Sequence, residues 1–138
     1  MAGLFRGLRQ QLAQIVSPST RRDLAELASR EIGRQVQLGF DLKEDPYGVP
    51  WKPRRRPGPG SLMDRTGALR DGIFAEASPG RVEVRVTGPA KRYAPFHQSG
   101  TRRLPRRRFM PDGNEIPERW KKSLVMLSDG YFDQKWKR

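Results

Sequence analysis

The chain has 138 residues and no cysteine, and its 28 Lys and Arg against 15 Asp and Glu give a formal charge of +13. The length favours a single domain over residues 1–138, and the lack of cysteine excludes disulfides, thiolate zinc sites and a cysteine nucleophile. No apolar run approaches the ~20 residues of a bilayer span. Because the N-terminus mixes charged with apolar residues, unlike a secretory signal, we expect an intracellular protein without membrane contact.

The excess positive charge lies in the middle of the chain. Residues 52–108 hold 15 basic and 4 acidic side chains, whereas residues 1–51 and 109–138 each carry a net charge of +1. Arginine predominates, and its planar guanidinium suits phosphate or carboxylate groups. We expect the arginine clusters to contact either a nucleic acid or an acidic protein surface. The clusters consist of Arg54, Arg55, Arg56, Arg102, Arg103, Arg106, Arg107 and Arg108.

The first forty residues predict two amphipathic helices that face the core. Apolar residues recur at spacings of three and four over 2–16 and again over 24–40. Ser17-Pro18 should end the first helix, because proline cannot donate the next backbone hydrogen bond. Ser19 or Thr20 should then cap the second helix.

A loop is predicted over residues 45–53, where prolines and a glycine occur without an apolar period. We expect Trp51 to be buried and to hold this loop on the core. Residues 54–60, with the sequence RRRPGPG, suit neither a helix nor an inner strand. They should form an exposed, mobile, basic arm.

The pattern over residues 72–88 is the best specified in the chain. Apolar or small residues alternate with polar ones on both sides of Pro79-Gly80, which is typical of an antiparallel β-hairpin with one buried face. Before it, residues 62–70 predict a short helix with Leu62, Met63 and Leu69 facing inward.

The remaining third of the chain predicts short elements and one longer helix. After a short apolar segment over 93–100, residues 101–108 should form a second basic loop, and Phe109-Met110 a last short strand. Residues 116–127 predict a helix with Pro117 in its first turn, and residues 129–138 a tail that detaches from the body.

Together these elements indicate an α+β fold with long basic loops. The predicted parts are a helical lead-in over 1–40, a loop and small antiparallel sheet over 41–111, and a C-terminal helix with its tail over 112–138.

Few residues suit catalysis. A lone histidine such as His97 is more often a packed or hydrogen-bonded side chain than a catalytic base. Asp41, Glu44 and Asp45 cluster at a helix end, but they lack the spacing of a calcium loop. The chain has no glycine-rich phosphate loop, no dinucleotide motif and no G-x-S-x-G elbow. We therefore expect no enzyme, no cofactor and no metal site, and a small nuclease built on these four residues is the remaining enzymatic alternative.

Five short motifs occur in order across residues 45–110. In this order, with helices on either side, they resemble the virion morphogenesis, or tail completion, family of tailed bacteriophages, including those of Mu-like phages. The motifs are the D-P-x-G-x-x-W run with Asp45, Pro46, Gly48 and Trp51; the run Thr66-Gly67-Ala68-Leu69; the valine hairpin closing on Gly88; Tyr93, His97 and Gly100; and the arginine run ending at Phe109.

The resemblance implies a small α+β component of the phage neck that completes the tail and joins it to the filled head. It also implies a ring homo-oligomer, hexameric or of another ring symmetry, around the channel for double-stranded DNA in the virion. Its partners would be neighbouring neck and adaptor proteins and tail-tube or terminator proteins.

Within such a ring, the arginine loops would face either the DNA or an acidic face of the next ring. We expect a protein contact for at least one of them, because a strongly DNA-binding lumen would hinder the exit of DNA. The exposed edges of a small sheet are places where neighbouring chains add strands. The alternative is a basic protein that binds nucleic acid without reading its sequence, through phosphate contacts that weaken with salt.

Overall fold

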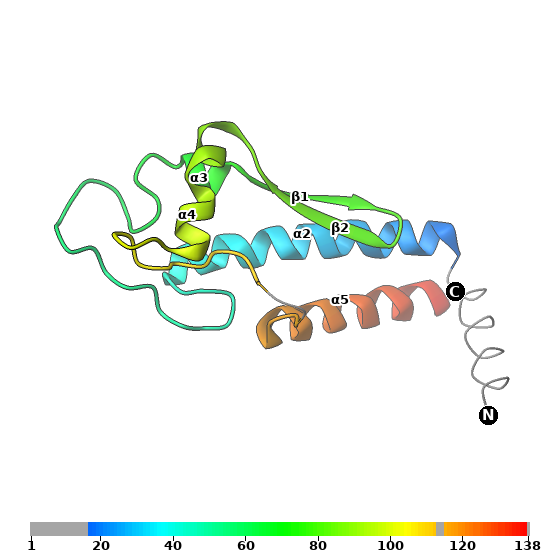
Figure 1. Cartoon of the computed structure of the whole chain (residues 1–138). Coiled ribbons are helices and arrows are strands. Elements are labelled where there is room, and N and C mark those ends of the chain that lie inside the picture. Colours follow the sequence, from blue (N-terminus) through cyan, green and yellow to red (C-terminus); the bar gives the residue numbers. More distant parts are fainter. Residues whose placement is uncertain (1–16, 113–114, 138) are drawn as a thin grey trace, which may run out of the picture.

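The computed structural model describes residues 17–112 and 115–137 and confirms the α+β fold (Figure 1). The predicted helix over 2–16 lies outside the described residues. In chain order the elements are helix α2 (Pro18–Leu42), helix α3 (Ala68–Asp71), strands β1 (Ile73–Ser78) and β2 (Arg81–Val86), the 3-10 helix η1 (Gly88–Arg92), helix α4 (Ala94–Ser99) and helix α5 (Glu118–Trp136).

Helix α2 is the longest element, and the hairpin and helix α5 pack along it. Its 25 residues, at ~1.5 Å per residue, span about 37 Å. The Ser17 hydroxyl accepts a hydrogen bond from the Thr20 N–H at 3.2 Å, and Pro18 occupies the first turn, where its missing N–H leaves no bond unmade. The helix therefore begins earlier than predicted, and the expected cap at Ser19 or Thr20 is wrong.

The predicted hairpin is confirmed. Strands β1 and β2 pair in antiparallel register from Ile73 opposite Val86 to Ser78 opposite Arg81, with Pro79-Gly80 as the turn. The hairpin lies along α2 (Figure 1). Its inner face is half-buried, whereas Phe74 on the opposite face is 53% exposed.

The C-terminal helix is longer than predicted. Helix α5 runs antiparallel to α2 as far as Trp136, so the expected end near residue 127 and the detached tail are wrong (Figure 1). The Tyr131 hydroxyl donates a hydrogen bond to the Asp23 carboxylate at 2.7 Å, and the Lys135 ammonium donates to Thr20 Oγ1. These contacts with α2 outweigh the low helix propensity of Gly130.

Two further predictions fail for local reasons. The helix expected over 62–70 is reduced to α3, because Met63 takes a left-handed backbone conformation (φ 66°) and Gly67 another (φ 78°). Leu69 is nevertheless buried as expected, and Leu62 and Met63 are partly buried against the core.

The strand expected at Phe109-Met110 is absent from the described structure. The Gln98 side chain takes the place of a partner strand there. Its Oε1 accepts hydrogen bonds from the Phe109 and Met110 N–H groups, both at 3.2 Å, and its Nε2 donates to the Met110 carbonyl at 2.7 Å.

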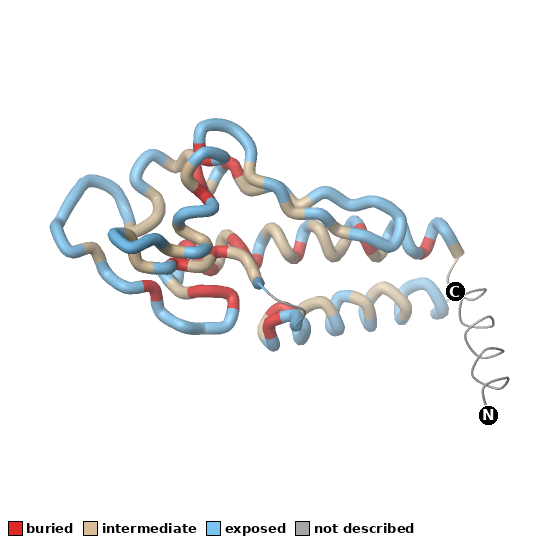
Figure 2. The backbone as a smooth tube through the Cα atoms, viewed as in Figure 1, coloured by how far each residue is buried: buried red, intermediate tan, exposed pale blue. Residues whose placement is uncertain are grey.

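The core gathers around the C-terminal half of α2, at the end of the molecule that carries the long loops (Figure 2). Trp51 is only 6% exposed, and its ring meets that of Phe40 edge-on with 5.3 Å between centroids. Its Nε1 donates to the Arg108 carbonyl at 2.7 Å, which confirms that Trp51 fixes its loop on the core. The buried cluster consists of Val36, Phe40, Trp51, Leu69, Ala90, Ala94, Phe109 and Trp120.

We predict that Trp51→Ala lowers the free energy of unfolding by about 3–5 kcal/mol, because it opens a cavity beside Phe40 and leaves the Arg108 carbonyl unpaired. Trp136→Ala, at a tryptophan that is 67% exposed, should change it by less than about 1 kcal/mol. Urea denaturation of the three proteins gives both values, and equal stability of wild type and Trp51→Ala would contradict the burial.

Candidate functional site: the arginine-rich loops

The two arginine-rich loops lie at the same end of the molecule, where α2 ends (Figure 1). The first follows α2 and includes residues 43–67, and the second follows α4 and includes residues 100–112. Backbone and side-chain hydrogen bonds join them at several points, so that two segments far apart in the sequence form one surface.

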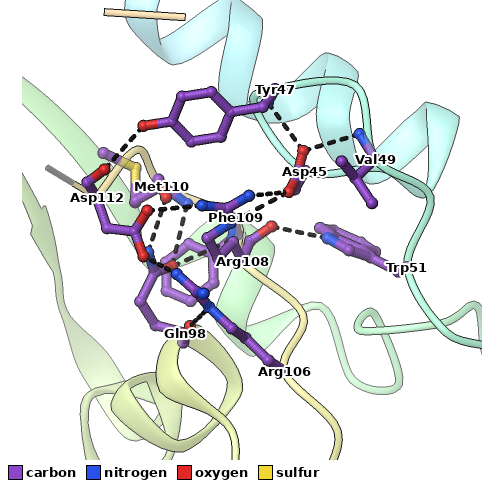
Figure 3. A network of polar contacts seen from close by, with 10 residues as sticks. All are labelled: Asp45, Tyr47, Val49, Trp51, Gln98, Arg106, Arg108, Phe109, Met110 and Asp112. Atoms are coloured by element: carbon purple, nitrogen blue, oxygen red, sulfur yellow. Dashed lines mark hydrogen bonds and ion pairs between the residues drawn. The ribbon is translucent and has the colours of Figure 1, made fainter. Parts of the chain in front are cut away.

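Asp45 is the centre of that junction (Figure 3). It is 4% exposed, and its Oδ1 accepts hydrogen bonds from the Tyr47 and Val49 N–H groups, both at 2.9 Å. Its Oδ2 accepts two more from the Arg108 guanidinium, at 2.6 Å and 3.1 Å. A buried carboxylate with four donors of this kind is fully satisfied, and it fixes both the turn that follows it and the arginine.

Arg108 connects Asp45 to two further residues, Asp112 and Tyr47. Its Nη1 donates to Asp112 Oδ1 at 2.7 Å, and its guanidinium lies over the Tyr47 ring at 4.5 Å from the centroid. The Tyr47 hydroxyl in turn donates to the Asp112 carbonyl at 2.9 Å (Figure 3). Tyr47 and Asp112 were not singled out from the sequence, because their role depends on contacts across 65 positions.

Three more of the arginines expected at an interface bind groups of the protein itself. Arg107 is 6% exposed and donates to the carbonyls of Lys52 at 2.8 Å and Pro53 at 3.2 Å. Arg106 pairs with the Asp112 carboxylate. Arg54 donates to three carbonyls of its own loop, those of Gly58, Pro59 and Ser61.

The other four arginines of the clusters remain available. Within the described residues, the guanidinium groups of Arg55, Arg56, Arg102 and Arg103 have no hydrogen-bond or ion-pair partner, and all four residues are exposed. The eight predicted contact residues therefore divide equally into structural and accessible ones.

The motif residues mostly shape the backbone. Gly48 takes a positive φ of 85° beside the buried Pro46, in the turn that Asp45 caps. Gly100 (φ 74°) lies so close to Arg106 that an added Cβ would be 2.9 Å from its backbone nitrogen.

The other motif residues hold the short helices on the core. The Thr66 hydroxyl accepts a hydrogen bond from the Ala68 N–H at 3.4 Å, just before α3. Phe109 lies 6.5 Å from the Phe40 ring, and Tyr93 meets His97 edge-on at 5.8 Å.

The four residues considered for a nuclease do not converge. Asp41 pairs with Arg70 at 2.7 Å and Glu44 with Arg119 at 2.6 Å, while Asp45 pairs with Arg108. Among the described residues, no group of three or more His, Asp or Glu side chains could hold a metal ion.

His97 lies against Arg107, whose backbone N–H donates to the His97 carbonyl at 2.9 Å. Burial, with a smaller effect of the Arg107 charge, lowers the pKa of His97 below its usual 6.5. Its Nδ1 is buried without a hydrogen-bond partner among the described residues. Burial also lowers the pKa of Arg107, followed by repulsion from Arg54.

We predict that Asp45→Asn lowers the free energy of unfolding by about 1–3 kcal/mol, because the amide turns an N–H₂ donor toward Arg108 and leaves that guanidinium less well paired. Arg55→Ala, which removes an exposed arginine from the neighbouring loop, should change it by less than about 0.5 kcal/mol. Urea denaturation distinguishes the two, and equal effects would show that Asp45 has no special role.

A second prediction concerns acid. Since the pKa of His97 is lower in the folded chain, the unfolded chain binds more protons below the usual pKa of 6.5. The stabilising contribution of neutral His97 is therefore complete above that pH and is lost as the pH falls toward the folded pKa. Denaturation midpoints measured between about pH 7.5 and 5.5 should fall more for the wild type than for His97→Gln. Parallel curves would contradict the lowered pKa.

Among the described residues, none of the helices combines the length and the apolar character that crossing a membrane requires.

Searches of curated proteins and of solved structures find no significant match. The model of the phage virion morphogenesis family matches residues 4–121, which is most of the chain and includes both arginine loops, the hairpin and the start of α5. The chain therefore belongs to the phage virion morphogenesis family, whose members serve in the assembly of the phage particle.

Proposed function

We propose that the protein is a structural component of the phage neck, similar to those of Mu-like phages, which completes the tail and joins it to the filled head. In this role several copies form a ring around the DNA channel, contact the neighbouring neck and tail proteins, and catalyse no reaction. Membership of the virion morphogenesis family supports an assembly role. The finer assignment depends mainly on the open edges of the sheet.

The sheet has two strands, and within the described residues each pairs only with the other. Both outer edges therefore carry backbone N–H and C=O groups without a partner strand. The Gly72 carbonyl accepts a hydrogen bond from the Thr87 N–H at 2.7 Å. Hydrogen-bonded and non-hydrogen-bonded pairs alternate along an antiparallel ladder. Counted from the hydrogen-bonded pair Gly72–Thr87, the pair Ala77–Val82 is non-hydrogen-bonded, so its N–H groups point away from the partner strand, toward the open edges.

Such edges suit a ring. A strand edge of one copy that adds to a different surface of the next copy makes a head-to-tail contact, and contacts of this type close into rings. Exposed apolar side chains on the same molecule offer further surface for neighbours: Phe74 on the hairpin is 53% exposed and Met126 on α5 is 75% exposed.

The test uses a phage that encodes this chain and from which its gene is deleted. We predict that the deletion leaves filled heads and separate tails, visible by electron microscopy, and that the wild-type gene restores joined particles. Ala77→Pro, which removes an outward N–H from the β1 edge without breaking a bond between the two strands, should fail to restore them. Ala77→Thr, which keeps that N–H, should restore them.

Purified Ala77→Pro protein must melt close to the wild type for its failure to count, and circular dichroism shows whether it does. Joined particles formed without the protein, or purified virions that lack it, would contradict the neck assignment.

The second candidate is a basic protein that binds nucleic acid without sequence preference. The four accessible arginines, Arg55, Arg56, Arg102 and Arg103, favour it. It requires that the isolated protein binds duplex DNA with an affinity that falls steeply with salt. Binding that is absent or independent of salt would exclude it.

A further inference from the structure

A cavity of about 750 Å³ opens between the first arginine loop, the turn before α3 and helix α4. Four arginines contribute to its wall, namely Arg54, Arg56, Arg65 and Arg107, whereas none of the described residues that line it is an Asp or a Glu. Two carboxylates lie near Gly67 of this wall without lining the cavity themselves: Asp64, which pairs with Arg70 at 3.7 Å, and Asp71. The cavity is therefore a concave surface with positive charge and no carboxylate of its own to neutralise it.

The arginines in this wall differ in their freedom. Arg107 and Arg54 are held by backbone carbonyls, which satisfy their N–H groups but leave their charges unneutralised. Burial, followed by repulsion from the Arg54 charge, lowers the pKa of Arg107. Arg56 and Arg65 are exposed, and within the described residues their guanidinium groups have no partner. An anion bound between these four would relieve the repulsion.

Part of the cavity wall is apolar. Leu62, Met63 and Leu69 line it, and Leu69 is buried. Met63 takes a positive φ of 66° in a turn closed by the hydrogen bond from the Asp64 N–H to the Ser61 carbonyl at 3.0 Å. A flexible thioether side chain adapts readily to different apolar groups. The surface thus offers an apolar contact together with positive charges.

Two possible occupants fit this surface poorly. A second copy of the chain carries the same charge of +13, and its longest run of consecutive acidic residues is the pair Glu44-Asp45, both of which already bind arginines. Duplex DNA presents phosphates that would contact the arginines but leave the apolar side chains unused. An extended peptide with carboxylates on both sides of an apolar residue matches the arginines and the apolar side chains together.

We propose that this cavity binds an extended acidic segment of a partner protein, with an apolar side chain against Leu62 and Met63 and carboxylates paired with Arg56 and Arg65. The inference goes beyond the neck assignment, because the chemistry of the cavity is the same wherever the protein assembles. In a neck, it would hold the ring to an acidic neighbour by a peptide segment.

The experiment measures binding of a short fluorescein-labelled polyglutamate peptide with one central leucine to the full chain, by fluorescence anisotropy. The wild type should bind it, and a peptide with serine in place of the leucine should bind several-fold more weakly. Reversing both free charges with Arg56→Glu and Arg65→Glu should weaken binding about tenfold or more. The matched control, Arg102→Glu with Arg103→Glu, makes the same change of charge outside the cavity and should weaken binding less than about threefold.

The single histidine gives an independent readout, because His97 lines the same cavity and its ring produces one set of NMR signals. These signals should shift when the peptide is added to the wild type or to the control variant, and should stay unchanged in the variant with Arg56→Glu and Arg65→Glu. Thermal melting shows whether that variant is folded. We expect it to fold, because the side chains of Arg56 and Arg65 have no partner among the described residues.

Equal loss of binding in the two double variants would overturn the inference, since it would show diffuse attraction to the whole basic surface. So would binding that does not depend on the leucine, or His97 signals that never respond. Head–tail joining is measured separately, so a protein that binds the peptide through Arg56 and Arg65 but is dispensable for joining would keep this inference and lose the neck role.

Discussion

The carboxylate of Asp45 connects the two halves of the loop end. It accepts hydrogen bonds from its own turn and from Arg108, which is 63 positions later in the chain. Arg108, held in this way, presents its carbonyl to the Trp51 indole, and Trp51 packs on Phe40 at the centre of the core. Such a network rigidifies a fold only when each of its members is satisfied. This buried charge, together with the bonds from Arg107 to the first loop, fixes the position of both arginine loops and of the accessible arginines on them.

Three arginines of the middle segment, Arg54, Arg106 and Arg107, bind backbone oxygen atoms. Arg107 donates to two carbonyls of the first loop, and Arg54 donates to three within that loop. Carbonyl groups satisfy the donors without cancelling the charge, so the potential of the surface stays positive while the loops become ordered. A count of charges along the sequence cannot distinguish an arginine that binds backbone carbonyls from one whose guanidinium has no partner within the chain.

The sequence predicted the features that depend on local patterns. The alternation on both sides of Pro79-Gly80 specified the hairpin, and the apolar spacing after residue 24 specified α2. The burial of Trp51 also followed from its place in a proline-rich loop. The end of α5 could not be predicted, because its last turns are held by Tyr131 and Lys135 on residues of α2 that are more than a hundred positions away.

The same limit applies to the start of α2 and to the site. Ser17-Pro18 is a signal that suits the end of one helix as well as the beginning of another, and only the hydrogen bond to Thr20 decides between them. The sequence predicts all eight cluster arginines as one group of contact residues, and their contact with a partner stays a prediction. It could not separate Arg108, which is fixed by Asp45, from Arg55, which is exposed, because the partners lie in other segments. The Gln98 amide replaces a partner strand for Phe109 and Met110, and which backbone groups it binds depends on how the second loop folds back on α4.

The antiparallel arrangement of α2 and α5 brings residue 17 and residue 137 to one end of the molecule, and the arginine loops lie at the other (Figure 1). The described structure therefore has a polarity: one pole is rich in arginine, and the other is where the chain enters α2 and leaves α5. Copies related by simple rotation around an axis all point the same way along it. In the proposed ring, long helices that lie along the axis would make one rim basic and would place the two helix ends at the opposite rim. Stacking on other rings would then have a fixed order, because only one rim could meet an acidic neighbour.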